Sequence, residues 1–136
     1  MTLDDIADRW FRQLWQQGDW EGLDRLHAPH FVDRTPGPNR APDNAGFKKG
    51  IREFYEAFPD FRAEIDHTVV DDEARKIAIR WTASATHIGP YLGFAPTRKR
   101  IAFAGIEILR VEDDLVVERW GEWDGLGLRA QLSSGA

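Results

Sequence analysis

The 136-residue sequence contains no cysteine. This absence excludes a disulfide framework, a thiolate metal site and a cysteine nucleophile. The sequence also lacks any apolar run close to the roughly 20 residues that cross a membrane, and its N-terminus is charged where a signal peptide is apolar. We therefore expect a cytoplasmic protein without a membrane partner.

Positive charge is not concentrated anywhere in the sequence. The 18 basic and 23 acidic residues are interspersed, the formal net charge is −5, and the longest basic cluster is the short segment 98–100. A protein that binds nucleic acid needs a dense basic surface to meet the phosphates. We therefore expect no nucleic-acid partner.

Several motifs of known chemistry are also missing. The sequence has no Gly-x-Ser-x-Gly elbow, no phosphate-binding loop and no Gly-x-Gly-x-x-Gly segment. His27, His30 and Asp33 could be considered as metal ligands, but nothing in their spacing fixes a geometry, and a closed zinc site usually has four ligands. We therefore expect neither a metal nor a cofactor.

Aromatic residues, by contrast, are abundant, with six tryptophans and eight phenylalanines. So much aromatic area suggests a large core, a lined cavity, a buried subunit interface or a mixture of these. The length suits a single domain, residues 1–136, that buries a core without disulfides or metals, and residues 133–136 are expected to fray.

Apolar residues recur at helical spacing in the N-terminal part and predict three helices. The first begins after Thr2, an N-cap residue, and the second after Asp19. The third begins near residues 44–45 and ends before Pro59, because proline disfavours helical geometry in the residue that precedes it. A short extended piece at 31–34 precedes the third helix.

From Phe61 the period changes to two, which indicates β-strands joined by turns in an antiparallel meander. In this alternation His67 is expected to face the core. Helices before strands are typical of an α+β fold, here three N-terminal helices packed on a strongly curved, mainly antiparallel sheet that encloses a cone-shaped pocket. The predicted strands are residues 61–69, 76–87, 101–111 and 115–124, with a loop at 89–99 and helical turns at 126–132.

The last predicted strand has an unusual face. Alternation places these side chains together: Val116, Glu118, Trp120, Glu122 and Asp124. A face that carries both indole and carboxylates favours the wall of a ligand pocket. The alternative is an edge strand whose acidic side chains are solvated, and a bulge at Gly121 would change the alternation after it.

Two residues are candidates for catalysis. Asp124 follows Trp123, and burial beside an indole would raise the pKa of its carboxyl and make it a better base, whereas the alternative is an N-cap for the helical tail. His87 has the same parity as Trp81 and two small residues, which leaves room for a ligand, and its alternative is a buried core histidine.

The chain resembles the SnoaL-like polyketide cyclases, a group within the nuclear-transport-factor-two-like superfamily. The resemblance extends over nearly the whole length, and it depends on short segments whose order and spacing are fairly specific for the group. These segments are Phe31–Pro36, Ala57–Phe61, Thr86–Gly89 with Gly93–Thr97, Val117–Trp120 with Asp124, and Gln131–Leu132.

The resemblance implies a cone-shaped α+β barrel, dimeric or larger, with a deep apolar pocket between sheet and helices. In the group's characterised cyclases the aspartate that matches Asp124 removes a proton from an activated carbon of an aromatic polyketide ester, and the enolate closes a ring by aldol chemistry. No metal or cofactor is required. A histidine that matches His87 lies in the same pocket, and Arg34 stands where a histidine most often follows the aspartate that matches Asp33.

Three functions remain open at this point. The first is a cofactor-free cyclase-like enzyme for a hydrophobic, carbonyl-bearing small molecule, with Asp124 as the base and His87 as an orienting or polarising group. The second is hydrolysis of an epoxide or ester in the same pocket, and the third is a non-catalytic ligand-binding or dimerisation module. A homodimer or higher homo-oligomer is expected. The expected substrate-binding residues are Arg34, Asp33, Phe54, Phe58, Trp81, Tyr91, Trp120 and Glu122.

Overall fold

The structure, a computed structural model, describes residues 1–134, so the end of the predicted frayed segment lies outside the described residues. Within them the chain forms an α+β fold, as the sequence predicts, and its five strands make one sheet, in which the extended piece predicted at 31–34 is, up to residue 33, part of a longer first strand. In chain order the elements are α1 (Leu3–Phe11), the π-helical turn η1 (Arg12–Gln16), the 3₁₀-helical turn η2 (Glu21–Arg25), β1 (His27–Asp33), α2 (Asn44–Ala57), β2 (Arg62–Asp71), β3 (Lys76–Thr86), β4 (Arg100–Glu112), β5 (Leu115–Trp123) and α3 (Gly125–Ser133).

The α-helices begin where the sequence provides N-caps. The Thr2 hydroxyl accepts from the Asp5 N–H at 3.1 Å and the Asp5 carboxylate accepts from the Thr2 N–H at 3.0 Å, which forms a capping box for α1. Asp43 caps α2 by accepting from the Gly46 N–H at 2.9 Å. None of the helices within residues 1–134 is long and apolar enough to cross a membrane.

The predicted arrangement of three N-terminal helices needs a correction. Only α1 and α2 are α-helices in the part of the described chain that precedes the meander. The second predicted helix is the 3₁₀-helical turn η2, because little chain remains between Gly18, which has a left-handed φ of 67°, and β1. The further α-helix, α3, follows the sheet.

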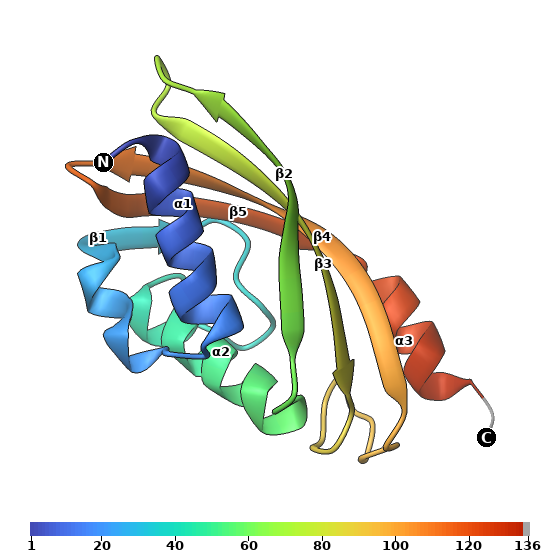
Figure 1. Cartoon of the computed structure of the whole chain (residues 1–136). Coiled ribbons are helices and arrows are strands. Elements are labelled where there is room, and N and C mark those ends of the chain that lie inside the picture. Colours follow the sequence, from blue (N-terminus) through green and yellow to red (C-terminus); the bar gives the residue numbers. More distant parts are fainter. Residues whose placement is uncertain (135–136) are drawn as a thin grey trace.

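The sheet has the strand order β1-β5-β4-β3-β2. β2 to β5 pair antiparallel with their neighbours in sequence, which confirms the predicted meander, whereas β1 pairs with β5 in parallel. The long strands twist and curve, and α1 and α2 lie on one side of them (Figure 1). This order leaves β1 and β2 as edges of the described sheet, so the sheet is open and the predicted barrel is not closed by strand pairing.

The core lies between α1, α2 and the concave face of the sheet. The predicted inner face of β3 is confirmed by its burial: Ile77, Ile79, Trp81, Ala83 and Ala85. From α1, Trp10 and Phe11 are buried against this face. The alternation of β3 therefore gives a reliable guide to which side of the sheet is inside.

A one-residue bulge reverses the alternation in β5. Val116 pairs with Val111, but the next pair is Glu118 with Arg110, so Val117 is an extra residue. Val116 faces the core, as predicted, whereas the later members of the predicted face, Glu118, Trp120 and Glu122, lie on the outer side. The prediction for these three residues is therefore wrong. The residues of β5 that face the core instead are Arg119, Gly121 and Trp123.

A second bulge, in β2, explains the position of His67. Ile65 pairs with Trp81 and His67 pairs with Arg80, so Asp66 is an extra residue. Because Trp81 faces the core and Arg80 does not, His67 is turned outward and is exposed. The prediction that His67 faces the core is wrong for this reason.

Helix α3 covers the part of β4 that extends beyond the end of β5. The Gln131 side chain accepts from the Ala102 N–H at 2.9 Å and donates to the Ala102 carbonyl at 2.7 Å, as a neighbouring strand would. The Asp124 N–H donates to the Ala104 carbonyl at 2.9 Å. These bonds place α3 away from α1 and α2 (Figure 1).

Candidate functional site

A cavity of about 730 Å³ lies between α1, α2 and the concave face of the sheet. The connection from β1 to α2 contributes Thr35 and Gly37–Ala41 to its lining, and the connection from β3 to β4 contributes Pro90–Gly93. Its volume lies in the range of small-molecule sites. The aromatic side chains that line it are Phe11, Trp15, Phe47, Phe54, Phe61, Trp81, Tyr91, Phe103 and Trp123.

The aromatic side chains support one another through edge-to-face contacts. The Phe54 ring lies 5.9 Å from the Trp15 ring and 5.5 Å from the Tyr91 ring, at interplanar angles of 81° and 89°. Trp81 meets Phe103 at 5.5 Å and 84°. These are favourable geometries for aromatic pairs. Several elements therefore fix the shape of the apolar wall together.

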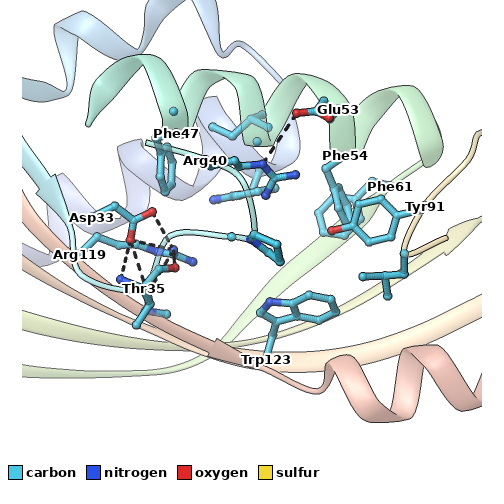
Figure 2. A pocket seen from close by; sticks show the side chains of 18 of the residues that line it. Asp33, Thr35, Arg40, Phe47, Glu53, Phe54, Phe61, Tyr91, Arg119 and Trp123 are labelled. Atoms are coloured by element: carbon cyan, nitrogen blue, oxygen red, sulfur yellow. Dashed lines mark hydrogen bonds and ion pairs between the residues drawn. The ribbon is translucent and has the colours of Figure 1, made fainter. Parts of the chain in front are cut away.

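Three charged side chains from three strands meet at one end of the cavity: Asp33 of β1, Glu107 of β4 and Arg119 of β5. Nη1 of Arg119 lies 3.2 and 3.3 Å from the Asp33 carboxylate oxygens. Its Nε and Nη2 donate to Oε1 of Glu107 at 3.0 and 2.9 Å. Figure 2 shows Asp33 and Arg119 side by side at this end. The guanidinium is therefore held between two carboxylates.

Thr35 and Gly121 make room for this cluster and support it. The Thr35 N–H donates to Oδ1 of Asp33 at 3.0 Å, and the Gly121 N–H donates to the Thr35 hydroxyl at 2.8 Å. A Cβ atom at position 121 would collide with the Arg119 guanidinium and with Oε2 of Glu107. The absence of a side chain at Gly121 is therefore what allows Arg119 and Glu107 to meet.

Burial sets the protonation chemistry of the cluster. Glu107 is 3% exposed, and burial raises the pKa of its carboxyl above the usual range, although the Arg119 guanidinium opposes the increase. Burial alone would lower the pKa of Arg119, but Glu107 and Asp33 raise it, so Arg119 is a fixed cation. A carboxylate with a raised pKa accepts a proton better near neutral pH than an exposed one.

A second polar group lines the cavity apart from this cluster. Arg40, from the loop before α2, extends into the cavity between the Arg119 end and Tyr91 (Figure 2). Its Nε lies 3.8 Å from Oε1 of Glu53 on α2. Burial raises the pKa of Tyr91, with Arg40 opposing the increase, so the phenol stays protonated at neutral pH.

Asp124 lies outside the cavity. Its Oδ1 accepts from the Gly127 N–H at 2.8 Å, and the side chain is the exposed N-cap of α3. With Glu122 it borders a shallow depression on the outer side of the sheet. The prediction that Asp124 faces the pocket is therefore wrong, because the bulge at Val117 reverses the alternation, and the alternative prediction of an N-cap is confirmed.

His87 also lies outside the cavity, fully buried in the core. Its Nδ1 accepts from the Thr97 N–H at 3.1 Å and lies 2.9 Å from the Thr97 hydroxyl. The His87 backbone bonds to Lys99 and Arg98 at 3.0 and 2.8 Å. Burial lowers the pKa of the imidazole, which keeps it neutral. The side chain thus fixes the loop that carries Tyr91 to the cavity.

The other predicted substrate-binding residues divide into two groups. The cavity lining includes Asp33, Phe54, Trp81 and Tyr91, the placement that a binding role requires. The remaining four lie elsewhere: Phe58 packs in the core 5.4 Å from the His87 ring, Trp120 and Glu122 are on the outer side, and Arg34 is exposed. Nε of Arg34 donates to Glu118 at 2.7 Å, which turns this cation away from the cavity.

Sequence reasoning missed Glu107, Arg119 and Arg40 as site residues. One signal was available for Glu107, which continues the inward alternation of Ile101 and Phe103 in a predicted strand. A carboxylate at an inward position of a central strand is unusual, since buried charges are paired. The partners could not be identified, because Asp33 comes from a strand that is distant in the sequence and the bulge at Val117 hides the inward position of Arg119 on the neighbouring strand.

The histidines considered as metal ligands lie in different surroundings. His27 is buried, accepts from Nε1 of Trp10 at 2.9 Å and bonds to Oδ1 of Asn44 at 3.1 Å, whereas His30 is exposed. Burial lowers the pKa of His27 to about 4. Within residues 1–134, no group of three or more histidine, aspartate or glutamate side chains is arranged to hold a metal ion.

The open, curved sheet with helices over an aromatic cavity places the protein in the nuclear-transport-factor-two-like fold class. A profile of the SnoaL-like polyketide cyclases matches residues 5–132. The chain therefore belongs to the SnoaL-like polyketide cyclase family. No curated protein matches the chain at a significant level.

Solved structures of similar proteins support the assignment. TsrD from Streptomyces laurentii is 27% identical with a TM-score of 0.83, over 96% of this chain and 94% of that one. A candidate polyketide cyclase from Acidithiobacillus ferrooxidans is also 27% identical with a TM-score of 0.83, over 98% and 96%. IdmH from Streptomyces antibioticus, likewise a candidate polyketide cyclase, is 25% identical with a TM-score of 0.82, over 98% and 100%.

Proposed function

We propose that the protein is a cofactor-free, polyketide cyclase-like enzyme that acts on a hydrophobic, carbonyl-bearing small molecule. One observation carries the proposal: an aromatic cavity of about 730 Å³ contains a buried carboxylate, Glu107, paired with Arg119. An apolar space with a few convergent polar groups and a perturbed pKa is typical of an active site. Membership in the SnoaL-like family supports the reaction class.

In the proposed reaction Glu107 is the general base. Its carboxylate removes a proton from a carbon next to a substrate carbonyl, and the electron pair of the C–H bond forms an enolate. The enolate carbon attacks a second carbonyl of the same molecule, a C–C bond forms, and the resulting alkoxide takes the proton back from Glu107. The sequence of steps is redox-neutral, so it needs no electron acceptor.

Arg119 and Asp33 have supporting roles in this proposal. The Arg119 cation stabilises negative charge that develops on the enolate oxygen, because fixed charges act strongly in a site that excludes water. Asp33 is a positioning residue: its carboxylate contacts Nη1 of Arg119, while Glu107 contacts Nε and Nη2. The guanidinium therefore keeps its orientation when Glu107 is protonated.

The base can be tested by proton exchange without knowledge of the natural substrate. Wild-type protein should accelerate deuterium exchange at the carbon next to the carbonyl of bicyclic aromatic ketones such as α-tetralone, followed by NMR in D₂O. Glu107→Gln should lower the rate at least about a hundredfold, in line with the typical contribution of a general base. The matched control is Asp124→Asn, which keeps an N-cap residue on α3 and should retain the rate.

The opposite pattern, with exchange lost in Asp124→Asn and kept in Glu107→Gln, would show that the base is Asp124, as the family resemblance implies. Absence of exchange with every ketone that binds would contradict the enzymatic proposal. In that case the third function, a non-catalytic ligand-binding module, explains the same cavity. Direct binding of the ketones, measured by quenching of tryptophan fluorescence, separates these outcomes because Trp15, Trp81 and Trp123 line the cavity.

Hydrolysis of an epoxide or ester is a second candidate function. The observation that favours it is the arrangement of Arg119 between two carboxylates, Asp33 and Glu107, with the Thr35 hydroxyl beside them. Such a cluster offers both acceptors and donors to a water molecule. Incorporation of ¹⁸O from labelled water into the product distinguishes hydrolysis from ring closure, which incorporates none.

We also propose that the chain forms a homodimer through the outer side of the sheet. Ile106 and Ile108 are 39% and 36% exposed there, and Ile108 pairs with Trp120 of β5. Apolar side chains that cluster on an exposed face are typical of interfaces. Light scattering measures the molar mass in solution and tests this proposal. Wild type should have the mass of a dimer and Ile108→Glu that of a monomer, because the added charge disrupts only an interface that uses this side of the sheet.

A further inference from the structure

Arg40 is a cation in the cavity whose hydrogen-bonding capacity is largely unused. Its one ion pair with the described residues is with Glu53 at 3.8 Å, which exceeds the range of a hydrogen bond, and its other polar neighbour is the Tyr91 hydroxyl. Arg119, by contrast, donates to Asp33, Glu107 and Thr35. Since a guanidinium carries five N–H donors in a fixed fork, Arg40 can donate hydrogen bonds to a further partner.

The loop before α2 places Arg40 in a defined position. The Arg40 N–H donates to the Gly37 carbonyl at 3.3 Å, and Asn39 between them has a φ of 61°. Proline at the second position and a left-handed residue at the third are typical of a type II turn, which Pro38 and Asn39 provide. A Cβ atom at position 37 would lie 2.5 Å from Nη1 of Arg40, so Gly37 leaves space for the guanidinium.

We propose that Arg40 and the Tyr91 hydroxyl form a subsite for a carboxylate group of the ligand, separate from the Arg119 cluster that contains Glu107. The proposal rests on the proposed function only in that the same cavity takes the ligand. It names the substrate class: an aromatic or polycyclic ketone that also carries an acidic group. Arg40 is then a residue that determines specificity and takes no part in the proton transfer.

The surroundings of Arg40 favour an anionic group. A carboxylate that enters an apolar cavity loses its hydration and needs a cation and further donors in return. Arg40 is 23% exposed and offers a fork that matches a carboxylate in bidentate geometry. Tyr91 lines the same part of the cavity, and its raised pKa keeps its O–H available as a donor. Glu53, which is 41% exposed, competes for Arg40 and can turn to solvent when the ligand enters.

A pair of matched probes tests the proposal by titration calorimetry: anthraquinone-2-carboxylate and its methyl ester, which share the ring system and differ in charge. Wild-type protein should bind the acid at least about tenfold more tightly than the ester. Arg40→Met should reduce this preference to about twofold or less, mainly because the affinity for the acid falls. The matched control is Arg34→Met. It removes a cation that belongs to the same loop but is turned away from the cavity, so the preference for the acid over the ester should remain.

Glu53→Gln adds a test in the opposite direction. Removal of the competing carboxylate should tighten binding of the acid severalfold and leave the ester unchanged. An equal affinity for acid and ester in wild type, or a preference that survives Arg40→Met, overturns the subsite. If the ester binds without such a preference, the proposed function stands and only the subsite fails. If neither probe binds, the cavity does not take ligands of this class and both proposals fail.

Discussion

At position 121 the chain has room for a hydrogen atom and nothing larger. Gly121 lies on the inner side of β5, where Arg119 and Glu107 pass directly over it. The Gly121 N–H also donates to the Thr35 hydroxyl at 2.8 Å, which links the backbone to the same cluster. A single missing side chain therefore permits a buried ion pair between neighbouring strands. Glycine in a strand often marks such a close approach.

Gly121→Ala should therefore destabilise the protein by about 2 to 4 kcal/mol, because the added methyl group forces apart a buried ion pair. Urea unfolding followed by tryptophan fluorescence measures the change in free energy of unfolding. Gly125→Ala is the matched control, since the nearest atoms to its added Cβ belong to the Trp123 ring and lie at ordinary contact distances from 3.4 Å. Equal stability of the two variants would contradict the close packing assigned to position 121.

One buried side chain, His87, helps to anchor the loop between β3 and β4. His87 accepts from the Thr97 N–H at 3.1 Å, and its backbone bonds to Lys99 and Arg98 at the other end of the loop. Tyr91 and Leu92 of this loop line the cavity. The histidine that the sequence suggests as a catalytic group thus acts in the structure as the anchor of a wall segment.

His87→Leu should loosen this loop without unfolding the sheet. The Thr97 N–H loses its acceptor, so we expect the amides of the non-proline residues in 91–97 to exchange at least about tenfold faster with deuterium, while those of β3 and β4 stay protected. Hydrogen exchange measured by mass spectrometry gives both rates. Thr97→Ser, which keeps the N–H and a hydroxyl, should exchange like wild type. Unchanged exchange in His87→Leu would show that the loop is held by other contacts.

At the scale of strands, the sequence predicts positions well and faces less well. The period of two identifies the four strands of the meander to within a residue or two, since hydrophobic alternation is a local property. The extra residue at Val117 leaves no comparable signal, because Val116 and Val117 are both apolar and both buried. One unrecognised bulge then turns Trp120 and Glu122 outward and Arg119 inward.

At the scale of the whole molecule, the polar end of the cavity could not be predicted from the sequence. Glu107 and Arg119 lie on the paired strands β4 and β5, and Asp33 of β1 joins them only because β1 adds in parallel beside β5. Each alone resembles a surface charge, the usual fate of such residues. The aromatic content indicated a large core, a lined cavity or a buried interface, and aromatic side chains line the cavity of the structure.

The stability of the whole molecule should depend on pH through His27. Its pKa is about 4 in the folded protein against 6.5 ordinarily, because burial disfavours the imidazolium. The neutral ring is held as Trp10 donates to Nε2 and Asn44 accepts from Nδ1. The unfolded chain therefore binds the proton first. The contribution of His27 is complete above pH 6.5 and is lost as the pH falls toward 4.

From these pKa values, His27 alone should cost about 2 kcal/mol of unfolding free energy between pH 7.5 and pH 5. Glu107 has the opposite effect on the free energy of unfolding as the pH falls. Burial raises the pKa of its carboxyl, so folding favours the protonated form. His87 acts in the same direction as His27. The informative quantity is therefore the difference between wild type and His27→Gln, in which the other groups cancel.

Urea unfolding at several pH values gives the difference in free energy of unfolding between wild type and His27→Gln. This difference should shrink by about 2 kcal/mol as the pH falls to 5, because the variant lacks the group that takes up the proton. The control variant is His30→Gln, which removes an exposed imidazole from the same strand. A constant difference between wild type and His27→Gln across this range would mean that His27 is not held neutral by Trp10 and Asn44. The buried network that joins α1, β1 and α2 would then need to be reassigned.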